Sequence, residues 1–305
     1  MNSLRKFYFK LSVVNEYLEL PSILVTQKQK EDYQQLDSSM ECLSHYLQSY
    51  KNLIEVQSIQ KEWNFYKKRA NNFELIFTNQ YNTSNISKYQ PCSRSYYKLL
   101  EILKDLNLLS NQTFMRTAHI AEGPGGFVEC FQNLRGKINK QDHSYVLTLR
   151  DGTKSCPSWS DFITSKKNIT ICWGHDKTGN LYNVKNIINF RNQVKYASLV
   201  TADGGFDISQ DYNNQELYTY RLIFCEIVCA LSIQEKGGTF IVKMFDFFHQ
   251  QTQTLLWLLC NLYKNVYITK PFTSRSANSE KYVICHQFKG ISDSYLHKLL
   301  TAVSI

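Results

Sequence analysis

Short runs of β-favouring residues alternate with longer helical stretches from residue 117 onward, and this alternation constrains the fold more than any other feature. Strands are expected at Thr117–Ala121, Tyr145–Leu149, Asn168–Trp173, Ala197–Ala202, Thr239–Met244, Val266–Thr269 and Lys281–His286. Helices are expected at Glu216–Gln234 and Gln251–Tyr263. This alternation is typical of a mainly parallel sheet with helices on both faces. The last two strands could instead pair as a hairpin around a long loop.

The first ninety residues differ in composition, because they contain no glycine and are rich in Gln, Tyr, Lys and Glu. From about Asp32 to Ala70, apolar residues recur at intervals of three and four, which predicts one or two amphipathic helices. A further helix is expected from Ser93 to Leu109. We therefore expect residues 1–90 to form a mostly helical extension, residues 91–290 to form the main α/β domain, and residues 291–305 to form a helical tail.

Composition excludes several classes of protein. Hydrophobic residues make up 43% of the 305 residues, which is too many for a disordered chain. The sequence has no apolar window of about 18 residues and no apolar signal-peptide region, so we expect neither a membrane span nor secretion. Nine cysteines without a CxxC pair fit a reducing compartment, and Cys225 and Cys229 are expected in the core rather than on a metal. The net charge of +9 favours a polyanionic partner without identifying it.

A glycine-rich turn, Glu122-Gly123-Pro124-Gly125-Gly126-Phe127, joins the first of these strands to a helix. In a parallel sheet, ligands bind at the carboxyl ends of the strands, and glycine lets the backbone approach a ligand closely. The turn matches neither GxxxxGK[ST] nor GxGxxG, which disfavours a phosphate loop and a dinucleotide site. A smaller adenosine-bearing ligand such as S-adenosylmethionine fits better, and an ordinary strand-to-helix turn is the alternative.

Charged residues stand near other expected strand ends. Asp203 ends an apolar run, Lys243 lies within the apolar stretch GTFIVKMFD, and Glu280 precedes the last strand. Lys98 lies in the helix that begins SRSYYK. A lysine at the end of a buried strand is costly unless it is paired. Singly, such residues could be snorkelling lysines or helix caps, but together with the glycine turn they indicate an active site.

The ordered segments SRSYYK, AEGPGGF, TADGGF, FIVKMFD and KPFTSRSANSEKYVIC resemble the FtsJ-like (RrmJ-type) ribose 2′-O-methyltransferases. Within that family the likeness is greatest to the eukaryotic and viral cap methyltransferases that convert cap-0 into cap-1. It extends from about Lys61 to His286. The resemblance implies a Rossmann-like methyltransferase fold with a mainly parallel, seven-stranded sheet, S-adenosylmethionine as the cofactor and capped RNA as the substrate.

The resemblance also implies roles for individual residues. The catalytic Lys-Asp-Lys-Glu tetrad of the family corresponds to Lys98, Asp203, Lys243 and Glu280. Cofactor contacts are implied for the turn Glu122–Phe127 and for Ser93, Asn180, Leu181 and Asp203. RNA or cap contacts are implied for Arg69, Arg94, Asn213 and Asn278. Three positions depart from the family pattern, since Asn180 replaces an acid, Ser93 replaces Asn and Ser276 replaces Pro.

RNA binding also requires positive and aromatic surface. The segment Lys61–Arg69 interleaves basic residues with Trp63, Phe65 and Tyr66. Arg and Lys neutralise phosphates, and aromatic rings stack on bases or on a methylated guanine. Candidate RNA contacts are therefore Lys67, Lys68, Arg69 and, from the loop before the last strand, Arg275. A solvated helix face is the alternative. We expect the excess charge to form a path from Lys61–Arg69 across the strand ends to Lys98, Lys243 and Arg275.

Lys243 is expected to act as the general base, or at least to orient the attacking 2′-hydroxyl. A free lysine has a pKa of about 10.4 and stays protonated at pH 7, whereas burial and the nearby Lys98 disfavour its charged form. Asp203 and Glu280 oppose that effect, so the net pKa of Lys243 is left open. The chemistry implies no metal. His119, within the first strand, is expected to be a core histidine.

The leading functional hypothesis is a cap-specific mRNA 2′-O-methyltransferase acting on the first transcribed nucleotide. One alternative is an rRNA or tRNA ribose methyltransferase, and another is a non-catalytic RNA- or cap-binding subunit on the same fold. The cap hypothesis implies an intracellular protein of the nucleus or cytoplasm, and a capping enzyme or polymerase is a candidate partner.

Overall fold

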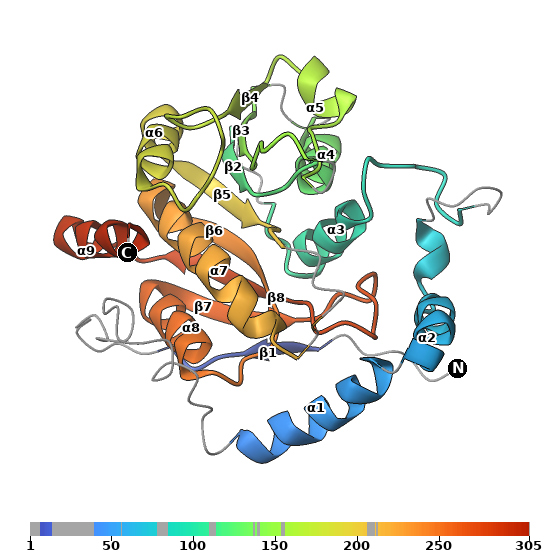
Figure 1. The fold of residues 1–305 in the computed structure, drawn as a ribbon. Coiled ribbons are helices and arrows are strands. Elements are labelled where there is room, and N and C mark those ends of the chain that lie inside the picture. Colours follow the sequence, from blue (N-terminus) through green and yellow to red (C-terminus); the bar gives the residue numbers. More distant parts are fainter. Residues whose placement is uncertain are drawn as a thin grey trace.

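One twisted sheet with helices packed on both faces organises the chain in the computed structural model (Figure 1). The structure describes residues 7–13, 40–55, 57–77, 85–109, 114–136, 138, 141–153, 156–205, 211 and 213–304. Within these ranges the sheet has eight strands: β1 Tyr8–Lys10, β2 Arg116–Ile120, β3 His143–Leu147, β4 Ile169–Cys172, β5 Ala197–Ala202, β6 Gln234–Met244, β7 Tyr263–Thr269 and β8 Lys281–Phe288. The strands expected from the alternating pattern are all present, with boundaries shifted by a few residues.

The strand order is β1-β7-β8-β6-β5-β2-β3-β4. Strands β4, β3, β2, β5 and β6 pair in parallel, so their carboxyl ends meet at one edge of the sheet. Strands β6, β8 and β7 pair antiparallel, which confirms the hairpin-like alternative for the last two strands. The sequence therefore predicted the α/β class and the mainly parallel arrangement of the sheet.

Strand β1 extends the expected seven-stranded sheet to eight. It pairs antiparallel with β7, placing Phe9 opposite Ile268, and the Tyr8 hydroxyl donates to the Asp105 carboxylate. The sequence predicts a mostly helical extension for residues 1–90 and does not indicate this strand. A segment of three residues has no periodicity of its own, so it becomes a strand only because the edge of β7 offers unpaired backbone groups.

The helices are α1 Glu41–Glu55, α2 Gln57–Arg69, α3 Ser95–Asp105, α4 Gly126–Arg135, α5 Asp161–Ser165, α6 Val184–Val194, α7 Gln215–Ile233, α8 Gln250–Leu262 and α9 Asp293–Val303, with a short 3₁₀ helix η2 at Glu74–Ile76. Helices α6 to α9 cover one face of the sheet, and α3 and α4 cover the other. Successive residues of β6 serve both cores, because Ile241 packs on the α3 side and Val242 on the α7 side. Cys225 and Cys229 are fully buried within α7, as expected.

The N-terminal helices α1 and α2 confirm the predicted pair of amphipathic helices, although residues 32–39 of that stretch lie outside the described residues. Helix α1 contacts the main domain at two places. The Lys51 ammonium lies 2.9 Å from the Asp246 carboxylate, and Asn213 donates to the Asn52 side chain over 2.5 Å. Across the described helices, no segment is both long enough and apolar enough to cross a bilayer.

Candidate active site

Asp203 and Lys243 meet at the carboxyl ends of β5 and β6. The two strands pair in parallel with Ala202 opposite Val242, so the next residue of each strand lies beside the other. The Lys243 ammonium donates to the Asp203 backbone carbonyl over 2.7 Å and lies 3.3 Å from its carboxylate. Both side chains are 12% exposed, which leaves the pair accessible from one side.

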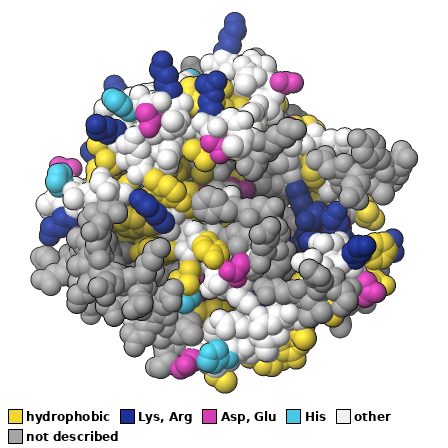
Figure 2. Space-filling view, in the orientation of Figure 1, with side chains coloured by type: hydrophobic (Ala, Val, Ile, Leu, Met, Phe, Trp, Pro, Cys, Tyr) yellow, Lys and Arg dark blue, Asp and Glu magenta, His cyan; other side chains and the backbone are white. Residues whose placement is uncertain are grey.

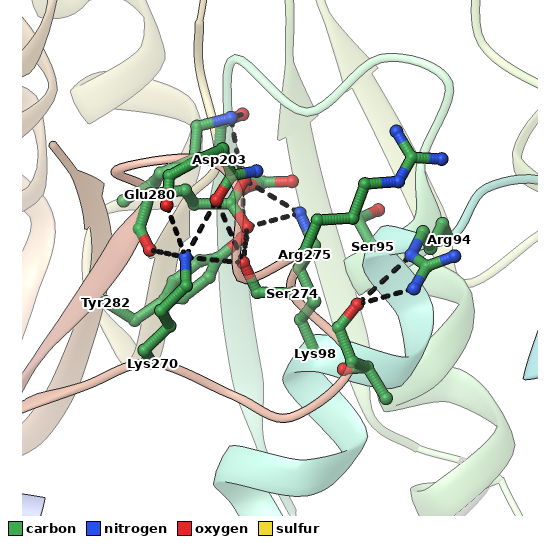
Figure 3. A network of polar contacts seen from close by, with 12 residues as sticks. Arg94, Ser95, Lys98, Asp203, Lys270, Ser274, Arg275, Glu280 and Tyr282 are labelled. Carbon is green, nitrogen blue, oxygen red and sulfur yellow. Dashed lines mark hydrogen bonds and ion pairs between the residues drawn. The ribbon is translucent and has the colours of Figure 1, made fainter. Parts of the chain in front are cut away.

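Lys98 and Glu280 form a second ion pair at the same edge. Lys98 projects from α3, and Glu280 ends the loop that precedes β8. The Lys98 ammonium lies 2.7 Å and 2.8 Å from the two carboxylate oxygens, and the Ser274 hydroxyl donates to one of them over 2.7 Å. Figure 3 shows these side chains converging from the helix and the loop.

Tyr282 joins the two ion pairs. Its hydroxyl donates to the Asp203 carboxylate over 2.7 Å, and its ring lies 5.9 Å from the Lys98 ammonium. Tyr282 stands opposite Lys243 in the β6–β8 register, which explains its position. The structure therefore brings all four residues of the expected tetrad together. Sequence reasoning missed Tyr282 because an aromatic residue in a buried strand is ordinary core.

The charges of this cluster act on one another. Burial acts to lower the pKa of Lys243, but neighbouring carboxylates outweigh it and raise the pKa above its ordinary value. These carboxylates belong to Asp203, Glu280 and Glu226. Burial acts to raise the pKa of Glu280, but the Lys98 and Lys243 ammonium groups outweigh it and lower the pKa below its ordinary value. At neutral pH, Lys243 is therefore an ammonium ion and Glu280 a carboxylate.

Two further carboxyl groups lie buried beneath this cluster. Burial raises the pKa of Glu122 well above its ordinary value and raises that of Glu226 to about 8. Glu226 accepts the Gly204 backbone N–H over 3.1 Å, and Glu122 accepts from the Thr201 hydroxyl. One oxygen of each carboxyl is buried without a hydrogen-bond partner among the described residues. Sequence reasoning missed Glu226, because it lies in the middle of an apolar helix, 22 residues along the chain from Gly204.

The glycine-rich turn begins where β2 ends and leads into α4. A side chain at Gly126 would lie about 2 Å from the Ser93 and Ser95 hydroxyl oxygens. Gly125 has φ +111°, a left-handed conformation that favours glycine. Glycine is therefore required here by close packing and backbone shape, whatever ligand binds. Phe127 is fully buried and packs in the core on the α3 side, so its ring does not face a ligand site.

The other expected cofactor residues also lie at this edge. Ser93 precedes α3, and its hydroxyl is 2.5 Å from that of Ser95. Asn180 and Leu181 lie in the loop between β4 and α6, where the Asn180 side chain accepts the Tyr182 backbone N–H over 2.9 Å. The Asn186 amide donates to the Asn180 carbonyl over 2.9 Å and so fixes this loop.

Glu74 holds two arginines that were expected to contact RNA. Its carboxylate lies 3.0 Å from the Arg94 guanidinium and accepts two hydrogen bonds from Arg275, of 2.7 Å and 3.0 Å. Arg94 also donates to the Thr273 carbonyl over 3.0 Å. Its guanidinium is therefore used largely within the protein, whereas the Arg275 side chain remains 35% exposed. Sequence reasoning included the Glu74 segment but missed this pairing.

The remaining RNA candidates lie along the same side. Lys67, Lys68 and Arg69 form the last turn of α2, and the Arg69 guanidinium lies 3.9 Å from the Phe65 ring centre. A pocket between α1, α2 and the loop before β8 is lined by Lys51, Ile54, Trp63, Lys67, Gln215, Arg275, Ala277, Asn278 and Ser279. Lys and Arg side chains gather beside α2 in the space-filling view (Figure 2). Asn213 is bonded to Asn52, and Asn278 is bonded to Lys270.

His119 is a core residue, as expected. It is fully buried in β2, it bonds to the hydroxyl groups of Thr117 and Thr201, and burial lowers its pKa to about 3. Across the described ranges, no three His, Cys, Asp or Glu side chains are grouped as a metal site requires.

A mainly parallel sheet with a glycine-rich strand-to-helix turn at the carboxyl ends of its strands is a Rossmann-like fold, and the motif order of this chain is that of a methyltransferase. The model of the family described as FtsJ-like methyltransferase matches residues 91–288. The chain therefore belongs to the FtsJ-like methyltransferase family. S-adenosylmethionine is the methyl donor of this family.

Curated relatives extend the match beyond the family segment. The chain is 28% identical over 263 residues to cap-specific mRNA (nucleoside-2′-O-)-methyltransferase 2 of Danio rerio, covering 82% of this chain and 35% of the relative. It is 34% identical over 199 residues to cap-specific mRNA (nucleoside-2′-O-)-methyltransferase 1 of Ailuropoda melanoleuca, covering 62% and 23%. A solved structure described as a ribosomal RNA methyltransferase of Plasmodium falciparum matches with a TM-score of 0.45 and 20% identity, covering 65% and 99%. The chain spans about a third of the length of the first of these relatives.

Proposed function

We propose that this chain is an S-adenosylmethionine-dependent mRNA cap methyltransferase that methylates the ribose 2′-hydroxyl of the first transcribed nucleotide, converting cap-0 into cap-1. The observation that carries the proposal is the convergence of the Lys98–Glu280 and Asp203–Lys243 pairs at the edge where the glycine-rich turn begins. Relatives described as cap-specific mRNA methyltransferases support a capped RNA as the substrate.

The residues at the glycine-rich turn fit the cofactor. Glu122 holds a buried oxygen without a hydrogen-bond donor among the described residues, and a cationic ligand would satisfy it. Helix α4 begins in the same turn, and its first backbone N–H groups have no partner within the helix. We assign cofactor binding to this turn together with Ser93, Asn180, Leu181 and Asp203. When bound, the cofactor supplies a methyl group activated by a positively charged sulfur.

Lys243 positions the attacking hydroxyl in the proposed reaction. Asp203 holds the Lys243 ammonium through its carbonyl and carboxylate oxygens, which leaves one N–H free to orient a 2′-oxygen. In its neutral form the same nitrogen would accept the proton of the 2′-hydroxyl during methyl transfer. Because the pKa of Lys243 is raised, the ammonium form that orients the oxygen prevails at neutral pH, and the neutral fraction that accepts the proton grows as the pH rises. Most of the acceleration then comes from holding the reacting atoms in line.

RNA binding falls to the N-terminal extension and the loop before β8. The pocket lined by Trp63, Lys67 and Arg275 opens between these segments, and it combines an aromatic ring with cationic groups. Rings stack on bases and cations neutralise phosphates, which suits the 5′ end of a capped RNA. We therefore propose residues 1–90 as an RNA-binding extension, residues 91–290 as the methyltransferase domain and residues 291–305 as a helical tail.

A methyl-transfer assay tests the proposed function. The full chain is incubated with tritiated S-adenosylmethionine and three RNAs of one sequence, bearing a cap-0 end, a triphosphate end or a hydroxyl end. We expect label on the cap-0 RNA, at the 2′-oxygen of the first nucleotide after digestion. Preferential labelling of an uncapped RNA would favour an rRNA or tRNA methyltransferase. Binding of capped RNA without transfer would favour a non-catalytic subunit.

The proposed substrate also implies a cellular location and a class of protein partner. A capped transcript places the activity inside the cell, in the nucleus or the cytoplasm. A capping enzyme or a polymerase is the partner that we propose, since each handles the same RNA end.

A further inference from the structure

Lys270 lies immediately after β7, at the start of the loop that carries Glu280 to the active site. Its ammonium group donates to the Asn278 carbonyl over 2.8 Å, to the Asn278 side-chain oxygen over 2.7 Å and to the Glu280 carbonyl over 2.8 Å. The Ser274 hydroxyl lies 3.3 Å away. One nitrogen thus ties the start of the loop to its end, as Figure 3 shows.

These contacts connect Lys270 to Glu280 in two ways. Lys270 fixes the backbone at Glu280 through the carbonyl oxygen. It also contacts Ser274, whose hydroxyl donates to the Glu280 carboxylate over 2.7 Å. The same carboxylate accepts from Lys98, so the orientation of the Lys98–Glu280 pair depends on the shape of this loop.

The surroundings of Lys270 fit a fixed structural cation. Burial lowers its pKa to about 8, and the nearby Lys281 and Lys98 add to this effect while Glu280 opposes it. A cation that is withdrawn from water in this way is costly unless its donors are satisfied. Three close oxygen acceptors satisfy them, and hydrogen bonds from a charged donor are stronger than neutral ones.

We propose that Lys270 is a positioning residue for methyl transfer, which holds the loop of residues 271–280 so that Glu280 is aimed at Lys98 and the reacting ribose. The inference rests on the proposed function. Lys270 touches none of the reacting groups in this role and acts through Glu280. Its donors hold Asn278 as well, so one side chain fixes both a catalytic carboxylate and an expected RNA contact.

Direct RNA contact is the competing role. The Lys270 side chain also lines a pocket with Asn71, Phe73 and Phe272, beside the N-terminal extension. A lysine that binds phosphate there would affect RNA affinity, whereas a positioning residue would affect the rate of the bound complex. The two roles therefore predict different changes in KM and kcat.

The test compares Lys270→Met with the wild-type full chain on the RNA that the wild type methylates best. We expect kcat to fall by about a hundredfold, the loss typical of a catalytic group displaced by about 1 Å, with the KM for RNA and the Kd for S-adenosylmethionine within about twofold. Lys264→Met, on the exposed side of β7, is the matched control and should retain wild-type kinetics. An unchanged kcat, or a raised KM with unchanged kcat, would overturn the role.

Single-turnover rates in a Glu280→Gln background show whether Lys270 acts through Glu280 or affects the rate independently of it. If Lys270 acts through Glu280, adding Lys270→Met to Glu280→Gln should slow the reaction by less than about twofold, because neighbouring sites that act as a unit are not additive. An equal loss in both backgrounds would show that Lys270 acts independently, contrary to the proposal.

Lys270→Arg gives a second variant, in case Lys270→Met does not fold. It keeps the charge and several N–H donors, so its kcat should lie between those of the wild type and Lys270→Met. If Lys270→Met does not fold, the test rests on Lys270→Arg. A wild-type kcat for Lys270→Arg would then overturn the positioning role, because a planar guanidinium cannot reach all three oxygen atoms that surround the Lys270 nitrogen. A wild type that methylates no RNA would refute the proposed function itself, whereas an active wild type with an unaffected Lys270→Met refutes only this inference.

Discussion

The Lys98 ammonium lies 2.7 Å from the Glu280 carboxylate, although 182 residues separate the two in the chain. Helix α3 presents the lysine, and the loop held by Lys270 presents the carboxylate. Both side chains are largely buried, and the Lys98 ammonium lowers the pKa of Glu280 and so keeps it ionised. The pair links the helix that follows the N-terminal extension to the last hairpin of the sheet, and it closes one side of the proposed active site.

Removing Glu280 should destabilise the protein as well as inactivate it. Glu280→Gln leaves the Lys98 ammonium buried without its partner, so the free energy of unfolding should fall by about 3 kcal/mol. The double variant Lys98→Met with Glu280→Gln removes both charges and should recover most of that loss. Urea denaturation of the two variants and the wild type measures the difference. Equal stability of Glu280→Gln and the wild type would contradict this prediction.

The same pair predicts a pH dependence of stability. The pKa of Glu280 is lowered from its ordinary value of 4.5, so the pair stabilises the folded state at pH values above 4.5. That contribution is lost as the pH falls below 4.5 toward the folded-state value. Wild-type stability should therefore fall more steeply in this acidic range than the stability of Glu280→Gln. Thermal melts at intervals of half a pH unit would reveal the difference, and parallel curves would exclude it.

Replacing Lys243 should remove activity without unfolding the chain. Lys243→Ala takes away the group that orients the hydroxyl and accepts its proton, so kcat should fall by about a thousandfold or more. The chain should stay folded, with a Kd for S-adenosylmethionine close to that of the wild type, although its melting temperature should fall because Asp203 loses its ion-pair partner. Lys236→Ala, at the exposed start of the same strand, is the matched control. Near-wild-type activity of Lys243→Ala would refute the assigned role.

Cofactor binding should release a proton from Glu122. Burial and the neighbouring Asp203 raise the pKa of Glu122 well above 4.5, and a cationic ligand beside it would lower that pKa. Affinity should therefore increase with pH, and calorimetry in buffers of different ionisation enthalpy should detect the released proton. Glu122→Gln should abolish the release and weaken binding about tenfold, or ~1.4 kcal/mol. Asp161→Asn, an exposed carboxyl on α5, should bind as the wild type does.

Arg275 should act on RNA affinity rather than on chemistry. Its guanidinium is paired with Glu74 but remains 35% exposed beside the pocket that contains Trp63. Arg275→Ala should weaken RNA binding and reduce the slope of log affinity against log salt concentration by about one. Fluorescence anisotropy at several salt concentrations measures this slope. Lys185→Ala, an equal charge change on α6, should leave it unchanged.

Local patterns predicted most of the fold. Periods of three and four residues marked α1, α2 and α3, and short β-favouring runs marked the seven main strands, because each pattern reflects how side chains meet a buried face. Strand β1 was missed, since its pairing depends on the exposed edge of β7 rather than on its own three residues. The sequence pattern also left open the direction of the strands at the antiparallel end of the sheet, because strand direction is set by the connections between strands.

The sequence by itself determined which residues we propose for the chemistry, because its motifs follow the order of the FtsJ-like family. Motif order identified Lys98, Asp203, Lys243 and Glu280, and the structure brings them together. Only the tertiary structure decided their partners and their charge states. Glu74, Tyr282 and Lys270 acquire their contacts from elements far apart in the chain, and the raised pKa of Lys243 results from three carboxylates that only folding places around it. Electrostatic and hydrogen-bond energies depend on distances and burial, and a linear pattern contains neither.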